Sequence, residues 1–401
     1  MLKKIKDNIS ELGFHFNNEL KTVFSDSGAV LLLVAAVLMY PIFYSIAYSG
    51  EALRDLNIAI VDLDNTGTSR KLTRIADATE QLKVATHSPS LKEAKELFNA
   101  GDVNGVLLIP EGFEKKIFRG ETSPLSVYCD VSYFLMYKQA LTGATYASSA
   151  LGAGVEIKRL MAQGYPDEKV AAMREPLAVK TYTLYNPLSG YGTFVMPGMM
   201  LLIIQQTLLI GIGVVGGTRR ERHQFYPELG SGSIGKTAMM LWGKASAYLL
   251  IYLINAIFNF IWINRWFRFP EKGSLMDVLI LMVPFLLATA FLGLAVSVLF
   301  RKRVHAMLFL TFSSPIVLFL SGISWPAQSI PTAIYKIAQV LPSTLMVPAY
   351  LRVRTMGVEL FQVNKELSMM ILQVAIYWLL ATVAYQITFK FKQKKEKMAN
   401  N

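Results

Sequence analysis

The chain has 401 residues, of which 53% are hydrophobic and only 17% are charged, and its formal net charge is +12. Soluble domains have about 25% charged residues, so this composition argues against an ordinary cytosolic enzyme. With a single cysteine and four histidines, the chain is neither a disulfide scaffold nor a zinc enzyme.

Residues 1–27 predict an amphipathic helix on a membrane surface, because apolar side chains recur at helical spacing with polar ones between them. These apolar residues are Leu2, Ile5, Ile9, Leu12, Phe16, Leu20 and Val23. The alternative is a helix that packs on a partner protein. The next apolar run, 28–48, exceeds the roughly 7–15 residues of a signal-peptide core. We therefore expect a first membrane helix rather than cleavage near Ala47 and Ser49.

Six apolar runs have close to the length that a helix needs to cross a bilayer, which is about 20 residues. They cover residues 28–48, 193–217, 239–263, 276–300, 306–323 and 368–388. Lysine and arginine gather before the first run, in the connections 218–237 and 301–303, and in the tail 390–401. The positive-inside rule therefore predicts that both termini are cytoplasmic. Because topology accounts for most of the basic excess, we expect no nucleic-acid partner.

Residues 49–192 separate the first two runs and are predicted to lie outside the cytoplasm, because the rule does not count long loops. Strand-like runs at 56–61, 82–85, 103–109 and 125–128 alternate with helix-like runs at 69–79, 90–100 and 112–118. This order predicts a small α/β domain. Residues 133–175 predict a helical stalk, and 179–184 a returning strand.

Residues 58–66 read IAIVDLDNT and match the strand-end DxDxT signature of haloacid-dehalogenase-type phosphatases. That chemistry also needs a downstream lysine and an acidic pair for Mg²⁺, and no suitable acidic pair occurs in this domain. We expect Asp62 and Asp64 to shape the turn after the strand instead. A membrane-tethered phosphatase is the alternative.

Residues 230–237 read GSGSIGKT and match the phosphate loop G-x-x-x-x-G-K-[ST]. A working phosphate loop directly follows a buried strand, whereas here polar residues and Pro227 precede the match and a membrane helix follows it. We therefore treat both matches as coincidental. This chain is expected to have no catalytic residue, no metal site and no cofactor, and ATP and Mg would be bound by another chain.

Four polar side chains lie inside the second and third apolar runs: Gln205, Gln206, Asn255 and Asn259. Polar groups at membrane depth are candidates for a functional site, here the lining of a path through the membrane. The alternative is that they make hydrogen bonds between helices and hold the bundle together.

One span, a large external domain and five closely spaced spans resemble the permease subunits of type-2 ABC exporters, in the bacterial branch with an enlarged external domain. Three motifs strengthen the resemblance beyond topology. IAIVDLDNTGTSRKL at residues 58–72 resembles the start of that external domain, and 185–187 followed by 194–198 resembles the motif before the second span. The segment after the fifth span has the family's pattern of glycine, tryptophan and prolines, with Ile330 where many relatives have methionine.

The resemblance implies a cytoplasmic coupling loop, 218–237, that docks on a separate ATPase. The docking residues would be Arg219, Arg220, Glu221, Arg222, Phe225 and Tyr226. The alternative is a solvated basic loop. The resemblance also implies an external re-entrant segment, 324–367, that closes the external end of the path; the alternative is an interfacial loop with Trp325 as an aromatic anchor. The residues of this gate and its motifs would be Asn186, Pro187, Pro197, Gly198, Gly322, Trp325, Pro326, Pro331 and Pro342.

We therefore expect an α-helical polytopic membrane protein with six transmembrane helices and an extracytoplasmic α/β domain inserted between the first and second. The expected function is the permease subunit of an ATP-driven exporter in the bacterial inner membrane, moving an amphipathic, drug-like or lipid-like substrate. Expected partners are a separate ABC ATPase, a second copy or a sister permease, membrane lipid, and a periplasmic adaptor docked on the external domain. The alternative is a membrane scaffold or receptor, but the chain has no sustained heptads of the kind that such relatives carry.

Overall fold

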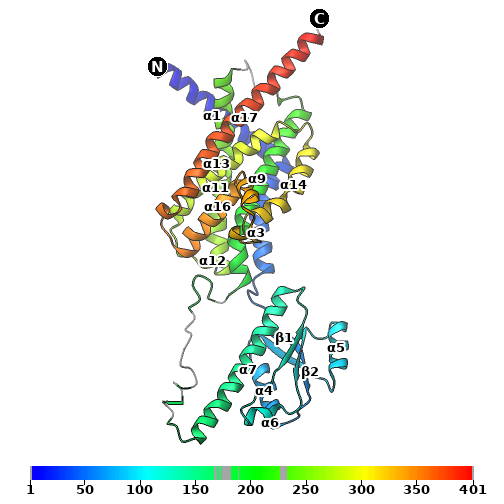
Figure 1. The fold of residues 1–401 in the computed structure, drawn as a ribbon. Helices are drawn as coiled ribbons and strands as arrows, with labels where there is room; N and C mark the ends of the chain where they lie inside the picture. Colours follow the sequence, from blue (N-terminus) through cyan, green and yellow to red (C-terminus); the bar gives the residue numbers. More distant parts are fainter. Residues whose placement is uncertain are drawn as a thin grey trace. The chain divides into compact units, whose positions relative to one another are not determined.

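A computed structural model describes residues 2–166, 169–170, 173, 182–187, 189–225 and 233–399, without the side chains of 2–9, 392 and 394–399. The chain divides into two compact units, shown in Figure 1. A helical unit comprises Met1–Glu51 and Thr183–Asn401, and a second unit comprises Ala52–Tyr182. The second unit therefore lies, in chain order, between the first and second membrane helices.

Six helical segments of the described chain are long and apolar enough to cross a membrane, and each overlaps a predicted run. They are Ser27–Ala47, Tyr191–Glu221, Ile234–Phe267, Leu275–Ser297, Arg303–Leu320 and Leu360–Phe391. The first comprises α2 (Ser27–Val30), the π-helix η1 (Leu31–Ala35) and α3 (Ala36–Ala47). The second is α9 (Tyr191–Glu221). The third comprises α11 (Ile234–Phe258), the π-helix η2 (Asn259–Ile263) and α12 (Asn264–Phe267).

The remaining spans are α13 (Leu275–Ser297), α14 (Arg303–Leu320), and η5 (Leu360–Val363) with most of α17 (Asn364–Ala399). Helix α13 is central, packing against α9, α11, α16 (Pro342–Tyr350) and α17. Helix α14 packs mainly on α9 and leaves Phe309, Phe312 and Ile316 exposed. Such a continuous apolar surface on a long helix is typical of contact with lipid.

The first and last described helices lie at the same end of the helical unit. Helix α1 (Leu2–Ser25) and the C-terminal part of α17 both lie there, while α12 lies at the opposite end (Figure 1). An even number of crossings requires this arrangement. We call the end with α1 the coupling end and the end with α12 the distal end.

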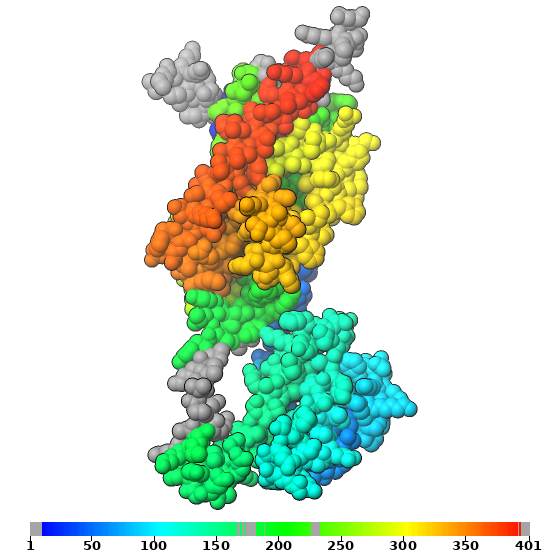
Figure 2. All heavy atoms as spheres, in the orientation of Figure 1, coloured from blue at the N-terminus to red at the C-terminus, as the bar shows by residue number. Residues whose placement is uncertain are grey.

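Between α14 and α17 the chain forms short helices instead of a seventh span. They are η3 (Ala327–Ser329), α15 (Thr332–Ala338), α16 and the π-helix η4 (Leu351–Met356). In Figure 2 the part near residue 330 lies on the surface between α17 and α14. Helix α16 is instead buried among α9, α13 and α17, with Ser343, Met346 and Tyr350 inaccessible. The segment 324–367 thus returns into the bundle after lying on its surface.

The second unit is a four-stranded sheet with helices on it. Strands β1 (Leu56–Asp62), β2 (Leu82–His87), β3 (Gly105–Ile109) and β4 (Ser126–Cys129) lie in the order β2-β1-β3-β4. Strand β1 is parallel to β2 and β3, and β4 is antiparallel to β3. The helices are α4 (Gly67–Asp77), α5 (Leu91–Ala100), α6 (Phe113–Phe118) and α7 (Phe134–Ala162).

These strands and helices occur where the sequence predicts them, and α7 forms the described part of the predicted stalk. The parallel pairs explain the near-continuous apolar runs of β1 and β3, since strands of this kind are buried on both faces. The strand predicted at 179–184 falls largely outside the described residues, and residues 182–184 are not in a strand.

Candidate functional site

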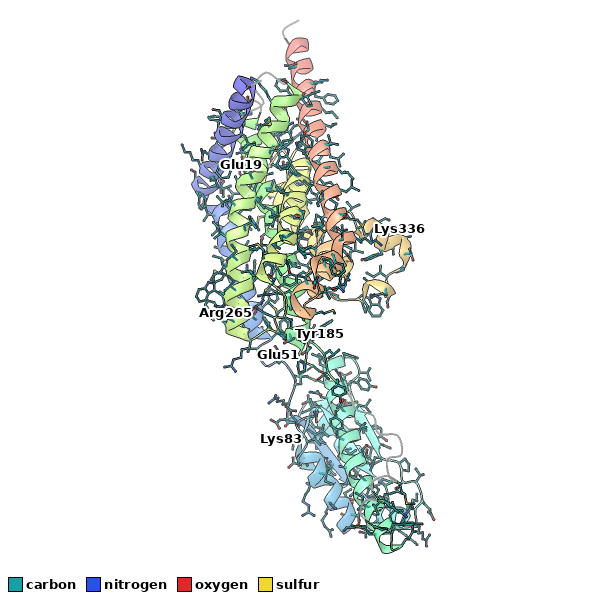
Figure 3. The ribbon with its side chains drawn as sticks, turned by 90° about the vertical axis from the view of Figure 1, so that its left-hand side faces the viewer. Glu19, Glu51, Lys83, Tyr185, Arg265 and Lys336 are labelled. Atoms are coloured by element: carbon teal, nitrogen blue, oxygen red, sulfur yellow. The ribbon has the colours of Figure 1, made fainter. Side chains whose placement is uncertain are left out.

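A buried charge cluster joins three helices at the coupling end. The Arg219 guanidinium at the end of α9 donates to both oxygens of Glu19 on α1, over 3.1 and 2.5 Å. The Tyr248 hydroxyl of α11 donates to Glu19 over 2.6 Å, and the Lys244 ammonium lies 3.8 Å from the same carboxylate. Figure 3 shows Glu19 on the face of α1 toward the bundle. This one carboxylate therefore connects α1, α9 and α11.

Burial and the two cations act on Glu19 in opposite directions. Burial raises the pKa of this fully buried carboxyl, but the charges of Arg219 and Lys244 and the hydrogen bonds from Arg219 and Tyr248 lower it to about 2. Glu19 is thus ionised at neutral pH. Burying an ion pair of this kind costs desolvation energy, and removing one member leaves the other charges buried without a partner.

Helix α1 also approaches α11 at backbone distance. A Cβ atom on Gly243 would lie 2.8 Å from the Leu12 carbonyl oxygen and from the His15 side chain, so only glycine permits the contact. The opposite face of α1 leaves Phe14 and Phe24 exposed by 66% and 59%. Thus α1 packs on its own chain with one face and presents apolar side chains on another.

The end of α9 and the residues directly after it, 218–225, bind neighbouring helices, and we call them the coupling segment. The Arg220 side chain donates to the Val298 carbonyl after α13 over 2.9 Å, and its guanidinium lies 4.0 Å from the centre of the Phe225 ring. Glu221 accepts from the Arg303 backbone N–H at the start of α14 over 3.1 Å. The Phe225 ring packs on Tyr385 of α17.

This geometry corrects one expectation about the coupling loop. A docking role for Phe225 requires an exposed aromatic anchor, but its side chain is only 3% exposed because α17 and Arg220 cover it. Arg219 is buried as well. Glu221 and Arg222 remain exposed, and Tyr226 lies outside the described residues. Four of the six proposed docking residues therefore fix the position of the segment within the bundle.

The asparagines in the third span bind the backbone of the first span. The Asn259 amide donates to the Val37 carbonyl over 3.3 Å, and the Asn255 amide donates to the Leu33 carbonyl over 3.0 Å. Pro41 has no N–H, so it leaves the Val37 carbonyl without its usual helical donor. Leu33 lies in π-helix η1, where the regular helical pairing is interrupted. Both asparagines thus make hydrogen bonds between two helices, as in the alternative to a path lining.

The two glutamines of α9 differ from each other. The Gln205 side chain accepts from the Ser343 backbone N–H over 2.7 Å and so caps the first turn of α16. The Gln206 amide is inaccessible, and neither its oxygen nor its nitrogen has a hydrogen-bond partner in the described part of the chain. An unsatisfied amide at membrane depth is costly. Gln205 Nε2 and Asn259 Oδ1 also lack a partner there, but of the four candidates Gln206 alone makes no side-chain hydrogen bond in the described residues.

The distal end is organised by side chains that bind backbone groups. Glu51, after α3, accepts from the Thr193 backbone N–H over 3.0 Å and from its hydroxyl over 2.9 Å, which caps the start of α9. Asn186 and Gly190 exchange two hydrogen bonds of 2.9 Å just before α9. A Cβ on Gly190 would lie 1.8 Å from the Glu51 carboxylate, so any larger residue there would displace this side chain from its bonds to Thr193. Figure 3 shows Glu51 near Tyr185 at this end of the helical unit.

The predicted gate residues do not all meet at one place. Gly198 of α9 packs closely against Ile323. A Cβ on Gly198 would lie only 2.6 Å from that side chain. Gly322 has a φ of +85°, which forms the turn after α14. Among the prolines, Pro187 lies in the turn before α9, Pro197 lies inside α9, Pro326 and Pro331 precede η3 and α15, and Pro342 begins α16. Trp325 is 58% exposed.

Arg354 is a further buried charge at the distal end. Its guanidinium donates to the Phe260 carbonyl of η2 over 3.1 Å and to the Gly273 carbonyl over 3.0 Å, and it pairs with Glu271. It therefore joins η4 to η2 and to the loop before α13. Like Asn255, it donates to a carbonyl in a π-helical segment.

Sequence analysis did not identify Glu19, Glu51 or Arg354. Glu19 carries a usable signal, since it lies between Phe16 and Val23 on the apolar face of an amphipathic helix. Lys244 gives another signal, as a charge inside an apolar run. Neither pattern reveals the partner, because Glu19 and Arg219 are 200 residues apart in sequence.

The two motifs that resemble catalytic signatures have local structural roles. Asp62 accepts from the backbone N–H groups of Asp64 and Asn65 and from the Ser69 hydroxyl, so it holds the turn between β1 and α4. Asp64 accepts from the Glu114 backbone N–H. Among the described residues, no group of three side chains is suited to hold a metal ion.

The described part of the second motif, 233–237, forms the N-cap and first turn of α11, while residues 230–232 lie outside the described residues. Thr237 accepts a hydrogen bond from Gln386 of α17 over 2.6 Å. Its hydroxyl is thus engaged in packing between α11 and α17.

Comparison with known proteins links these features to a family. A family model described as "ABC-2 family transporter protein" matches residues 28–383. The inner membrane transport permease YhhJ of Escherichia coli (strain K12) is 22% identical over 84% of this chain and 86% of its own length. The Shigella flexneri protein of the same name matches to the same extent. No solved structure matches.

Proposed function

Because the chain belongs to the ABC-2 transporter family, we propose that it is the permease subunit of an exporter driven by a separate ATPase. It is a multi-pass membrane protein, and its family implies a partner ATPase subunit. The observation that best supports this proposal is the coupling segment, which is anchored to four other helices at one end of the bundle. ATP and Mg would be bound by that partner, and this chain would contribute no catalytic residue.

The contacts of the coupling segment would transmit a movement of the ATPase to the membrane helices. Arg219 connects it to α1 through Glu19, Glu221 connects it to the start of α14, and Phe225 connects it to α17. A push on the exposed turn at Glu221 and Arg222 would therefore move three helices together. In this mechanism the closing ATPase shifts the bundle between inward-facing and outward-facing states.

Inside the membrane, we expect that shift to change the surroundings of the Gln206 amide. Its amide has no hydrogen-bond partner in the described residues, so a rearranged state that supplies one would be favoured. The proposed cargo is amphipathic or lipid-like, and the exposed apolar side chains of α14 support this proposal because they suit contact with acyl chains. We propose outward transport in the bacterial inner membrane, by a pair formed with a second copy or a sister permease.

The proposed orientation puts the coupling end in the cytoplasm. The basic residues 219–222, 301–303 and 390–397 support it, because cytoplasmic connections are rich in lysine and arginine. The unit Ala52–Tyr182 then lies outside the cytoplasm, where it could receive a periplasmic adaptor.

Affinity purification in mild detergent tests the proposal. We expect a cytosolic ATPase to copurify with the chain and its ATPase activity to depend on Glu221, whose substitution by alanine should weaken binding or coupling. Glu96→Ala, at an exposed position of α5, is the charge-matched control and should change neither. A folded chain that brings down no ATPase would contradict the proposal and favour a membrane scaffold or receptor.

A further inference from the structure

A polar cavity of about 220 Å³ opens between the end of α1 and the end of α9. Pockets for drug-sized ligands have volumes of about 300–1,000 Å³, so this cavity fits a small polar group better than it fits cargo. Its walls come from two short stretches of chain. They are formed by Lys21, Thr22, Ser25, Asp26, Val215, Thr218, Arg219, Arg222 and Gln224.

The charges of the cavity walls do not balance. Arg219 is paired with Glu19 in the buried cluster. Asp26, the acidic residue in the wall, is paired with Arg303 over 3.1 Å and also accepts from the first N–H groups of α2. Lys21 and Arg222 have no carboxylate within 4.0 Å in the described part of the chain. Two cations therefore face the cavity without a counter-charge, and this arrangement favours an anion.

The cavity lies where the chain passes into the membrane. Its α1 wall ends at Asp26, and the first membrane span begins at Ser27. Its α9 wall continues past Glu221, where the second span ends, to Arg222 and Gln224. The walls thus lie at the polar ends of two apolar spans. Phospholipid phosphates occupy this depth, at the boundary between polar groups and acyl chains.

We propose that this cavity binds the phosphate group of an anionic phospholipid, with Lys21 and Arg222 as its charged ligands. Arginine and lysine are the usual phosphate ligands, and basic pockets between membrane helices accept anionic headgroups. A bound lipid would connect α1 to the coupling segment beside the Glu19–Arg219 pair. The proposal depends on neither the direction of transport nor the cargo.

Lipid retention by the purified full-length chain tests the proposal without the ATPase. The protein is delipidated in neutral detergent and titrated with phosphatidylglycerol, phosphatidylcholine or inorganic phosphate, and bound lipid is measured by native mass spectrometry. We expect phosphatidylglycerol to bind about thirtyfold more weakly to the double variant Lys21→Gln, Arg222→Gln than to the wild type, since each cation near a headgroup contributes about 1 kcal/mol.

The matched control removes the same charge from the distal end. The variant Arg265→Gln, Arg268→Gln changes two exposed cations there and should retain phosphatidylglycerol as the wild type does. If the double cavity variant does not fold, Lys21→Gln alone gives the same comparison with an expected loss of about fivefold.

Three results would overturn the proposal. Equal retention of phosphatidylglycerol by the wild type and the cavity variant would show that the lipid binds elsewhere. Inorganic phosphate that raises the unfolding temperature as much as phosphatidylglycerol does would assign the site to a free phosphate. Loss of ATPase copurification with unchanged lipid retention would assign the cavity to the partner protein.

Discussion

The two ends of the helical unit are held together by different chemistry. At the coupling end, charged side chains from α1, α9 and α11 meet one another in a buried cluster around Glu19. At the distal end, Glu51 and Arg354 mostly bind backbone groups at helix ends and in π-helical turns. The first arrangement connects whole helices to each other, while the second fixes the ends of individual helices. We therefore expect the helices at the coupling end to move together when the ATPase acts on them. We expect the contacts at the distal end to hold short segments such as η2 and η4 in place.

The largest effect is expected from Glu19→Gln, which leaves the Arg219 and Lys244 charges buried without the carboxylate between them. Breaking a buried charge cluster in this way costs about 3–5 kcal/mol. Thermal unfolding of the purified chain in detergent should measure this loss. The control Glu11→Gln removes a partly exposed carboxylate 3.8 Å from Lys236 and should cost less than about 1 kcal/mol.

A double variant makes this test specific. Glu19→Gln combined with Arg219→Gln should be less destabilised than the sum of the two single variants, because the second change removes a charge that the first left unbalanced. Additive losses would mean that the two side chains do not depend on each other, and would remove the basis for connecting α1 to the coupling segment.

Acid should loosen the coupling end in a defined pH range. The pKa of Glu19 in the folded chain, about 2, lies below its ordinary value of 4.5. A carboxyl whose pKa is lowered by folding stabilises the fold above its unfolded pKa, and this stabilisation is lost as the pH falls through the folded pKa. The free energy of unfolding should thus fall between about pH 4.5 and pH 2, measured by denaturation at each pH. A Glu19→Gln variant with the same pH profile as the wild type would contradict this assignment.

At the distal end the expected effects are smaller. Arg354→Ala leaves the Phe260 and Gly273 carbonyls without a donor and Glu271 without its cation, at an expected cost of about 2–3 kcal/mol. Limited proteolysis and thermal unfolding should both report it. The matched control Arg352→Ala affects a partly exposed arginine that pairs with Glu366 and should cost about 1 kcal/mol or less. Equal losses in the two variants would show that burial of Arg354 is not what matters.

The spans and the α/β elements were predictable because their signals are local. Apolar runs and alternating periodicity depend on neighbouring residues, and the six spans and four strands occur close to where the sequence predicts them. The contacts of the site were not predictable in the same way. Glu51 caps a helix whose first residues follow it by 142 positions, and Phe225 is covered by Tyr385. A single sequence shows which side chains are polar at membrane depth, but not which distant carbonyl each one satisfies.

The smallest expected effect isolates one such carbonyl inside the membrane, between the two ends. Asn259→Leu removes the donor to the Val37 carbonyl and should cost about 1 kcal/mol, in the range measured for hydrogen bonds between membrane helices. The variant Pro41→Ala supplies a backbone N–H that can bond this carbonyl within the helix. In that background, Asn259→Leu should cost clearly less, and a double-mutant cycle of unfolding free energies measures the difference. An unchanged cost would mean that Asn259 acts through its packing or its bond to the Asn255 carbonyl, and not by compensating for the proline.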